Sequence, residues 1–154
     1  MGIIDANSAG NVHGGTIMRL ADEAAALAAI KHARKRVVTV GMDRMDFLVP
    51  IYVGDLVTLS ATVNAAWNTS MEVGVRVEAE NPRAGTIRHT NTAYITMVAL
   101  DESGDPGPVP PLRAESPVDQ RRMREAELRR ANRLSERVQI LAHRERHERG
   151  PSAP

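Results

Sequence analysis

The residues with the clearest chemical potential are a glycine pair at the start of a predicted helix and a carboxylate two turns further along. Gly14 and Gly15 carry no Cβ, so a ligand or another backbone segment can approach them closely. The first N–H groups of a helix lack intrahelical acceptors and carry partial positive charge, which suits a ligand carbonyl or oxyanion. Asp22 is the carboxylate, and it has the chemistry of a base or a nucleophile.

The helix that holds Asp22 is predicted from about residue 15 to residue 33, because this stretch has no proline and is rich in alanine. Small side chains allow another element to pack close to the helix, which removes water from Asp22. The face with Asp22 also carries Met18, Ala25 and Ala29. Glu23 has Arg19 one turn earlier and is the more ordinary acid, whereas Asp22 is either functional or a buried hydrogen-bond acceptor.

Helix geometry separates the glycine pair from Asp22. Seven residues at 1.5 Å each span roughly 10 Å along the axis, whereas a base or nucleophile must lie within about 3 Å of its target. One helix therefore cannot hold a carbonyl at its own N-terminus and attack it with its own Asp22. If both features act on one substrate, they come from two copies of the chain, which predicts a homodimer with two composite sites.

Several blocks of the sequence, in order, resemble one protein family. Residues 5–17, Asp-Ala-Asn-Ser-Ala-Gly-Asn-Val-His-Gly-Gly-Thr-Ile, are similar to the active-site segment of hotdog-fold acyl-CoA thioesterases, nearest to the brain-type cytosolic acyl-CoA hydrolases and their single-domain bacterial counterparts. Blocks at 46–55, 68–73 and 80–82 extend the resemblance, which covers roughly residues 5 to 102. It implies an enzyme that hydrolyses fatty acyl-CoA to free fatty acid and coenzyme A.

The fold implied by this resemblance is α+β: a hotdog fold, in which a long central helix is wrapped by a curved antiparallel sheet. Strand patterns and a hairpin turn follow the predicted helix, with strands at 36–45, 56–66, 71–79 and 86–100 and the turn at 83–85. The family also has a strand before its asparagine. Only residues 1–4 are available for it, so we expect that strand to be lacking or the sequence to begin after it.

We expect a hotdog domain followed by three further segments. They are the domain at 1–103, a Pro-rich linker at 104–117, a charged C-terminal helix at 118–149 and a disordered tail at 150–154. The helix holds ten of the twenty Lys and Arg residues and a narrow apolar seam of Leu128, Leu134, Val138 and Leu141. We interpret it as a solvated helix docked on the domain; a coiled coil or an arm for an anionic partner is the alternative.

Members of the family pair an asparagine upstream of the glycines with an aspartate on the helix of the other protomer. Asn7 and Asp22 match these two positions. Asn11 competes for the amide role, although it fits a helix-capping residue equally well. His13 is interpreted as a structural residue near the helix start.

Thioester hydrolysis builds negative charge on the carbonyl oxygen, so hydrogen-bond donors placed there supply a large part of the rate. We assign that role to the backbone N–H groups of Gly14 and Gly15. Asp22 of the facing protomer either activates water or attacks the carbonyl, and Asn7 orients the water or donates to the oxyanion. The sequence leaves these choices, and the preferred acyl chain length, open.

The phosphates of coenzyme A require basic partners along their path. The candidates are Arg36, Arg83, Arg88 and His89, with the turn at Ser70 supplying neutral donors. No cofactor is expected apart from coenzyme A as part of the substrate. No metal is expected either, because the chain has no cysteine and its five histidines show no ligand spacing.

Composition limits the partners and the compartment. The net charge of +1 gives no general attraction to nucleic acid or to a membrane surface, and no stretch is long and apolar enough to span a bilayer. Because the N-terminus also lacks a signal-peptide pattern, we expect a cytoplasmic protein. The resemblance further implies that the homodimer assembles into a hexamer, as a trimer of dimers.

Two other functions compete with the thioesterase. A non-catalytic acyl-CoA-binding sensor would signal through the C-terminal helix, but a sensor has no need of a desolvated carboxylate, so Asp22 and Asn7 argue against it. A hotdog dehydratase relies on a histidine paired with an acid, and His13 would have to meet Asp22 across the dimer.

Overall fold

The computed structural model describes residues 1–148, and the predicted tail at 150–154 lies outside them. A short 3-10 turn, Ile3–Asp5, precedes helix α1 (Gly14–Ala33), strands β1 (Arg36–Phe47), β2 (Leu56–Ala66), β3 (Ser70–Asn81) and β4 (Thr86–Leu100), and helix α2 (Pro117–Glu148). This confirms the predicted α+β class. The chain divides into two units, Met1–Arg113 and Ala114–Pro154.

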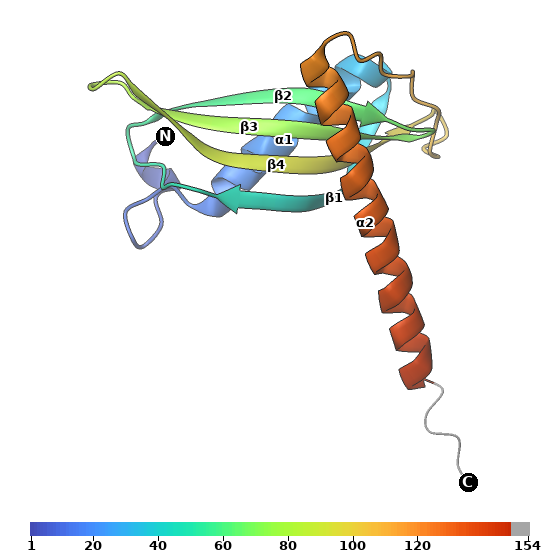
Figure 1. Ribbon diagram of the computed structural model, residues 1–154. Helices are drawn as coiled ribbons and strands as arrows, with labels where there is room; N and C mark the ends of the chain where they lie inside the picture. The colour runs from blue at the N-terminus through green and yellow to red at the C-terminus, as the bar shows by residue number, and fades with distance from the viewer. Residues whose placement is uncertain (149–154) are drawn as a thin grey trace. The chain divides into compact units, whose positions relative to one another are not determined.

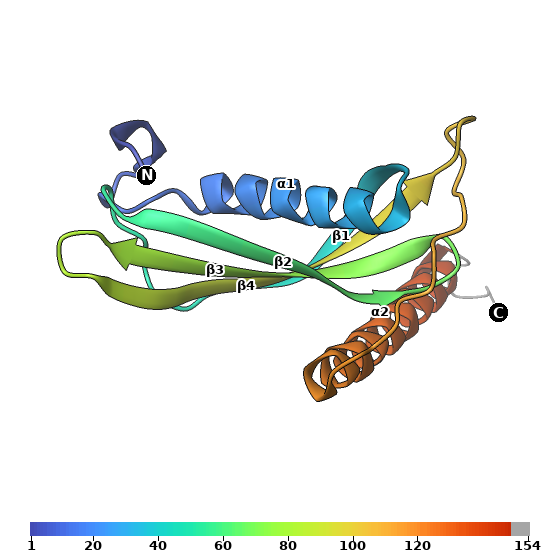
Figure 2. The same ribbon diagram turned by 90° about the horizontal axis from the view of Figure 1, so that it is seen from above.

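The four strands of the first unit form one antiparallel sheet in the order β1-β4-β3-β2. Helix α1 lies along one face of this twisted sheet (Figures 1 and 2). The β3–β4 hairpin turns where residues 83–85 predict it, with Gly85 at a positive φ of 65° that glycine adopts without steric cost. Strands β1 and β2 are the two edges of the sheet.

The core between α1 and the sheet consists largely of small and β-branched side chains. The helix buries one residue per turn: Ile17, Ala21, Ala25, Ala29 and Ala33. Alternate residues of the two central strands face it, chiefly Met71, Val73, Val75 and Val77 on β3 and Ala93, Ile95 and Met97 on β4. The buried stripe thus passes through Ala21, while Met18 is 43% exposed and Asp22 is half-buried at the margin of the stripe.

The first unit continues past the predicted domain end at residue 103. Within the Pro-rich segment, the Gly107 amide donates to the carbonyl of Ala99 at 2.9 Å, and the Val109 amide donates to the carbonyl of Asn68 at 2.8 Å. Lys35 adds a bond from its Nζ to the Pro108 carbonyl, also at 2.9 Å. Backbone pairing therefore attaches this segment to the end of the sheet, which explains why the unit extends to Arg113.

The second unit is built around α2, which begins one residue before the predicted start. Ser116 caps it: its Oγ accepts from the Asp119 amide at 3.1 Å and donates to the Asp119 carboxylate at 2.7 Å. Ion pairs one turn apart follow, such as Arg121 with Glu125 at 2.7 Å. The predicted apolar seam is exposed, as the 66% exposure of Val138 shows.

The cap of α2 predicts an acid-sensitive helix end. The hydrogen bond from Ser116 holds the pKa of the Asp119 carboxyl below its usual range. A carboxyl group whose pKa is lowered by folding stabilises the fold when the pH is above the ordinary pKa. This stabilisation is lost as the pH falls through the lowered pKa. We expect Ser116→Ala to reduce the helical circular dichroism signal at pH 7. We also expect the further decrease of that signal below about pH 4 to be smaller in the variant than in the parent. Identical acid titrations of the variant and the parent would contradict this role.

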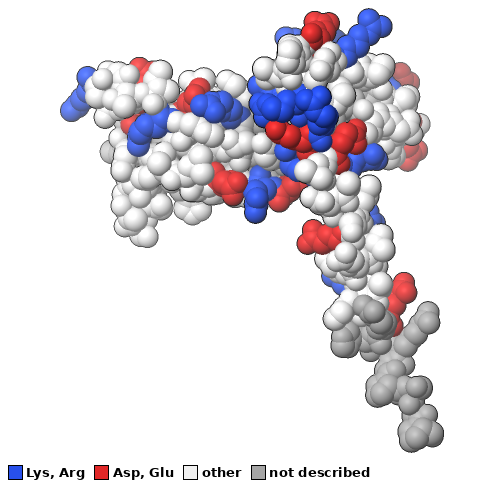
Figure 3. Space-filling view, in the orientation of Figure 1, with Lys and Arg blue, Asp and Glu red and all other residues white. Residues whose placement is uncertain are grey.

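The apolar length of the helices and the distribution of charged side chains are the next features of the described residues. None of the helices within residues 1–148 is long and apolar enough to cross a bilayer. On the face of the molecule drawn in Figure 3, basic and acidic side chains are interspersed. On β3, Arg76 forms an ion pair with Glu78 at 2.9 Å.

Candidate functional site

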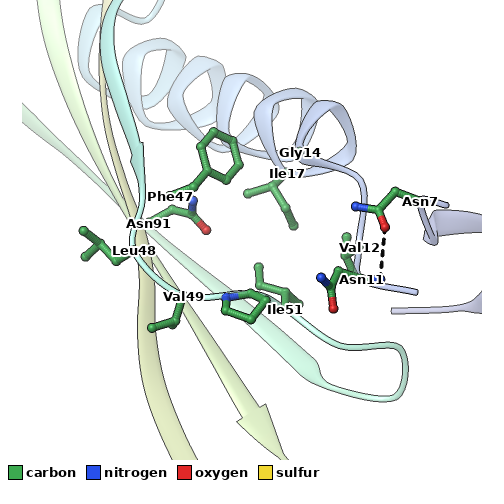
Figure 4. A pocket seen from close by; sticks show the side chains of 11 residues that line it. Asn7, Asn11, Val12, Gly14, Ile17, Phe47, Leu48, Val49, Ile51 and Asn91 are labelled. Atoms are coloured by element: carbon green, nitrogen blue, oxygen red, sulfur yellow. Dashed lines mark hydrogen bonds between the residues drawn. The ribbon is translucent and has the colours of Figure 1, made fainter. Parts of the chain in front are cut away.

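A pocket of about 280 Å³ lies in the first unit beside the N-terminus of α1 (Figure 4). Its walls come from the helix start, the turn before it, the segment after β1, and strand β4. Most of the lining is apolar: Val12, Ile17, Phe47, Leu48, Val49, Pro50 and Ile51. The polar lining consists of the backbone at Gly14 and three amide side chains, those of Asn7, Asn11 and Asn91.

The two predicted glycines at the helix start have different surroundings. The Gly15 amide donates to the Nδ1 atom of His13 at 3.0 Å, so His13 is the N-cap of α1. The Gly14 amide has no acceptor among the described residues, and Gly14 lines the pocket. A Cβ on Gly14 would lie 3.2 Å from the ring of Phe47, which is a tight contact. Of the two expected oxyanion donors, Gly14 is the one left unpaired.

Asn7 is held so that its amide nitrogen faces the pocket. Its Oδ1 accepts from the backbone amides of Ala9 at 2.9 Å and Asn11 at 3.1 Å, and Gly10 closes this tight turn with a φ of 79°. Because the oxygen is occupied by two N–H groups, the orientation of the amide follows from the hydrogen-bond network. In Figure 4 the Asn7 nitrogen points into the pocket, where it can only donate.

Asn11 is not the helix cap that the sequence also allowed. Its backbone pairs with Tyr52 in an isolated β-bridge, and its backbone carbonyl accepts from the backbone N–H of Asn7 at 2.7 Å. These bonds tie the turn to the segment after β1 and set the pocket wall. His13 is the capping residue instead, because its ring nitrogen accepts from the backbone N–H of Gly15. His13 thus has the structural role expected of it.

Asp22 is positioned by a residue that the sequence did not single out. The Thr39 Oγ1 of β1 donates to the Asp22 Oδ1 at 2.6 Å and lies 3.4 Å from the Met97 sulfur. This bond fixes the carboxylate at the β1 edge of the sheet. Nothing in the spacing of Thr39 points to it, because the contact depends on how the helix lies over β1.

Asp22 is not among the residues that line the pocket of its own chain. It lies eight residues beyond Gly14, about 12 Å along the helix axis, which agrees with the expected separation. Strand β1 beside it is an edge of the sheet, and two apolar side chains are exposed there, Val38 at 42% and Val40 at 64%. The carboxylate therefore faces an open edge rather than the pocket of its own protomer.

The five candidate residues for coenzyme A fall at opposite ends of the sheet. Arg36 pairs with Leu100 and Ser70 with Val98 at one end, whereas Arg83 lies in the hairpin at the other. The fifteen residues of β4 separate the two ends by roughly 45 Å. Within one protomer these residues are not brought together, and only Arg83, Arg88 and His89 lie at the pocket end.

Two of the candidates at the pocket end have structural partners. The guanidinium of Arg88 forms an ion pair at 2.6 Å with Asp55, a side chain only 4% exposed, and also donates to the Pro50 carbonyl at 3.2 Å. His89 Nε2 lies 2.8 Å from the Thr92 hydroxyl on its own strand. Arg88 thereby braces the segment that forms the apolar wall of the pocket.

Metal-binding groups are sparse in the part of the chain that the structure describes. No group of three or more His, Cys, Asp or Glu side chains within residues 1–148 is arranged to hold a metal ion. The polar groups at the pocket are amides, which serve as neutral hydrogen-bond partners.

A long helix along one face of an antiparallel sheet, with a pocket at its N-terminus, defines a hotdog-fold protein. A hexameric hotdog fold thioesterase of Campylobacter jejuni superposes with a TM-score of 0.66 at 33% identity, over 71% of this chain and 84% of that one. The chain belongs to the thioesterase superfamily, whose family model matches residues 9–86.

Sequence relatives support the same family. Protein VdlD of Helicobacter pylori is 40% identical over 72% of this chain, and the match spans 63% of its own length. An acyl-CoA hydrolase of Staphylococcus aureus, solved with butyryl coenzyme A, coenzyme A and coenzyme A disulfide, has a TM-score of 0.86 and 34% identity, over 96% of this chain and 90% of that one. Alanine variants of that enzyme at an asparagine, an aspartate and a threonine have also been solved, the asparagine variant with coenzyme A.

Proposed function

We propose that this protein is an acyl-CoA thioesterase that hydrolyses fatty acyl-CoA to free fatty acid and coenzyme A. The observation that carries the proposal is a pair of donors at one pocket, the Gly14 amide and the Asn7 amide nitrogen, neither of which has an acceptor among residues 1–148. Preorganised donors of this kind stabilise the oxyanion of a tetrahedral intermediate. The apolar walls suit an acyl chain or the reacting end of the thioester.

The variants of the Staphylococcus aureus enzyme support the assignment of residues. Its replaced asparagine and aspartate are fifteen positions apart, and its aspartate and threonine are seventeen apart. Asn7, Asp22 and Thr39 have the same two spacings. We therefore assign Asn7 as a donor to the thioester oxygen, Asp22 as base or nucleophile, and Thr39 as the residue that positions Asp22.

The active unit we propose is a dimer that shares its sites. Asp22 lies outside the pocket of its own chain and at the exposed β1 edge, so a second copy packed on this edge would receive it. An edge strand with unpaired N–H and C=O groups and exposed valines favours pairing with another chain. Because the Campylobacter jejuni relative is hexameric, we extend the proposal to a hexamer of three such dimers.

These residues and water supply the groups that take part in the proposed reaction. The thioester oxygen accepts from Gly14 and Asn7 while the partner's Asp22 takes a proton from the attacking water; the C–S bond then breaks, and this proton passes to the coenzyme A thiolate. In the alternative, the partner's Asp22 attacks the carbonyl itself and the C–S bond breaks to leave an anhydride. Water then hydrolyses the anhydride to the free acid and supplies the proton that the thiolate takes up. Arg83, on the exposed hairpin, forms no ion pair with the residues that the structure describes, and we keep it as the candidate for the coenzyme A phosphates.

Release of free thiol from a panel of acyl-CoAs tests the function. The chain has no cysteine, so a thiol-reactive dye reports coenzyme A without background from the protein. We expect release with a maximum at particular chain lengths. Tight binding of coenzyme A with no release from any acyl-CoA would contradict the enzyme and favour an acyl-CoA-binding module.

A further inference from the structure

The pocket contains one buried acceptor that the proposed reaction has not used. Asn91 on β4 is 1% exposed, and its Oδ1 has no hydrogen-bond partner among the described residues. Its Nδ2 donates to the carbonyl of Asp46 at 3.2 Å, which fixes which end of the amide is the oxygen. In Figure 4 this oxygen points away from the strands and into the pocket.

A buried carbonyl oxygen without a partner is unfavourable, and an apolar side chain of the same size would avoid that cost. Ile17 and Ile51, which line the same pocket, are apolar and provide no donor, and neither Gly14 nor Asn7 donates to this oxygen. Asn11 also lines the pocket, but it is only half-buried and reaches solvent. The oxygen of Asn91 is therefore placed for a donor that enters the pocket during the reaction.

Thioester hydrolysis requires hydrogen-bond donors for the thioester oxygen and hydrogen-bond acceptors for the attacking water. The thioester oxygen needs donors, and Gly14 and Asn7 supply them. The attacking water has two O–H groups, and both need acceptors if a lone pair is to be aimed at the carbonyl carbon. The carboxylate of the partner's Asp22 accepts one. Asn7 cannot accept the other, because its Oδ1 already holds two backbone amides.

We propose that Asn91 orients the hydrolytic water by accepting its second O–H on Oδ1. This inference rests on the proposed thioesterase function. The water oxygen forms a bond to the thioester carbon while one proton passes to the Asp22 carboxylate. The C–S bond then breaks, the acid is released, and the same proton passes to the coenzyme A thiolate. The proton on the Asn91 side stays with the acid.

Asn91→Leu tests the proposal, because leucine has a similar size and lacks the acceptor. We expect kcat to fall by about 100-fold, with KM and the Kd for coenzyme A changed less than twofold. Asn91→Ser keeps an acceptor oxygen and leaves room for a second water, so we expect it to be at least about tenfold faster than the leucine variant. If Asn91→Leu does not fold, Asn91→Ala must show the same loss relative to the parent.

Thr96→Val is the matched control, because Thr96 Oγ1 is the other buried unpaired atom described and it lies on the opposite face of β4. We expect its kcat to equal that of the parent. Equal kcat in the parent and Asn91→Leu would overturn the inference, as would a serine variant no faster than leucine. A raised KM at an unchanged kcat would overturn it too, and would assign the oxygen to an N–H of the substrate. If the parent protein hydrolyses no acyl-CoA, the proposed thioesterase function itself is wrong, and the role of Asn91 fails with it.

Discussion

Asp22→Asn is expected to lower kcat by about 10²–10⁴-fold, the usual contribution of a general base, while coenzyme A still binds. Asparagine keeps the size of the side chain and its hydrogen bond from Thr39, which donates at 2.6 Å. It removes the negative charge that would accept a proton or attack the thioester. The measurements are thiol release for kcat and calorimetric titration with coenzyme A for Kd.

Glu23→Gln is the control for this loss. Glu23 is the next residue on the same helix, is exposed, and pairs with Arg19 at 2.6 Å. An exposed pair of this kind contributes little, so activity and stability should match the parent. Wild-type turnover in Asp22→Asn would remove Asp22 from the mechanism, and equal losses in both variants would point to a general effect of helix charge.

Mixing two inactive variants should restore about one quarter of the parental activity. If each site takes Asn7 from one protomer and Asp22 from the other, a dimer of Asn7→Ala with Asp22→Asn has one intact site and one doubly defective site. Random exchange of equal amounts makes about half of the dimers mixed, each with half of its sites active. Thiol release after subunit exchange measures the recovery.

The control mixture combines Asp22→Asn with Asp22→Ala, which leaves no intact site in any dimer. No recovery in the test mixture, with exchange verified by mass spectrometry of tagged chains, would place both residues within one protomer. A monomeric mass in light scattering with full activity would contradict the shared site independently. Asn7→Ala itself should keep coenzyme A affinity, since Asn7 donates to the thioester oxygen in the proposed site.

Local sequence was sufficient to predict most of the first unit. Strands β2 and β4 have the predicted bounds, and β1 and β3 extend slightly beyond them. Alternation of side chains and a glycine at the hairpin are properties of a few neighbouring residues, and they persist whatever the rest of the chain does. The hotdog arrangement itself was expected from the resemblance, not from these patterns.

The site could be predicted only where it is local or matches the family. The sequence and the family resemblance point to Asn7, Gly14 and Asp22, whose catalytic roles are predictions. The sequence does not predict the role of Thr39, because its hydrogen bond to Asp22 joins a strand to a helix and no regular spacing of residues indicates that contact. The sequence does not reveal the ion pair of Arg88 with Asp55, because an exposed arginine and an arginine held by a buried carboxylate are the same residue type. The role of Arg88 toward coenzyme A remains a prediction.

The sequence by itself determined the helix, the four strands, the hairpin and the separation that keeps Asp22 from its own helix start, because backbone preference and a fixed rise per residue act over short distances. Only the tertiary structure decided that His13 caps the helix, that the amide of Asn7 faces the pocket, and that Asn91 brings a buried oxygen to it. These outcomes depend on strand register and on how the helix packs, and both are set by contacts between residues far apart in the chain.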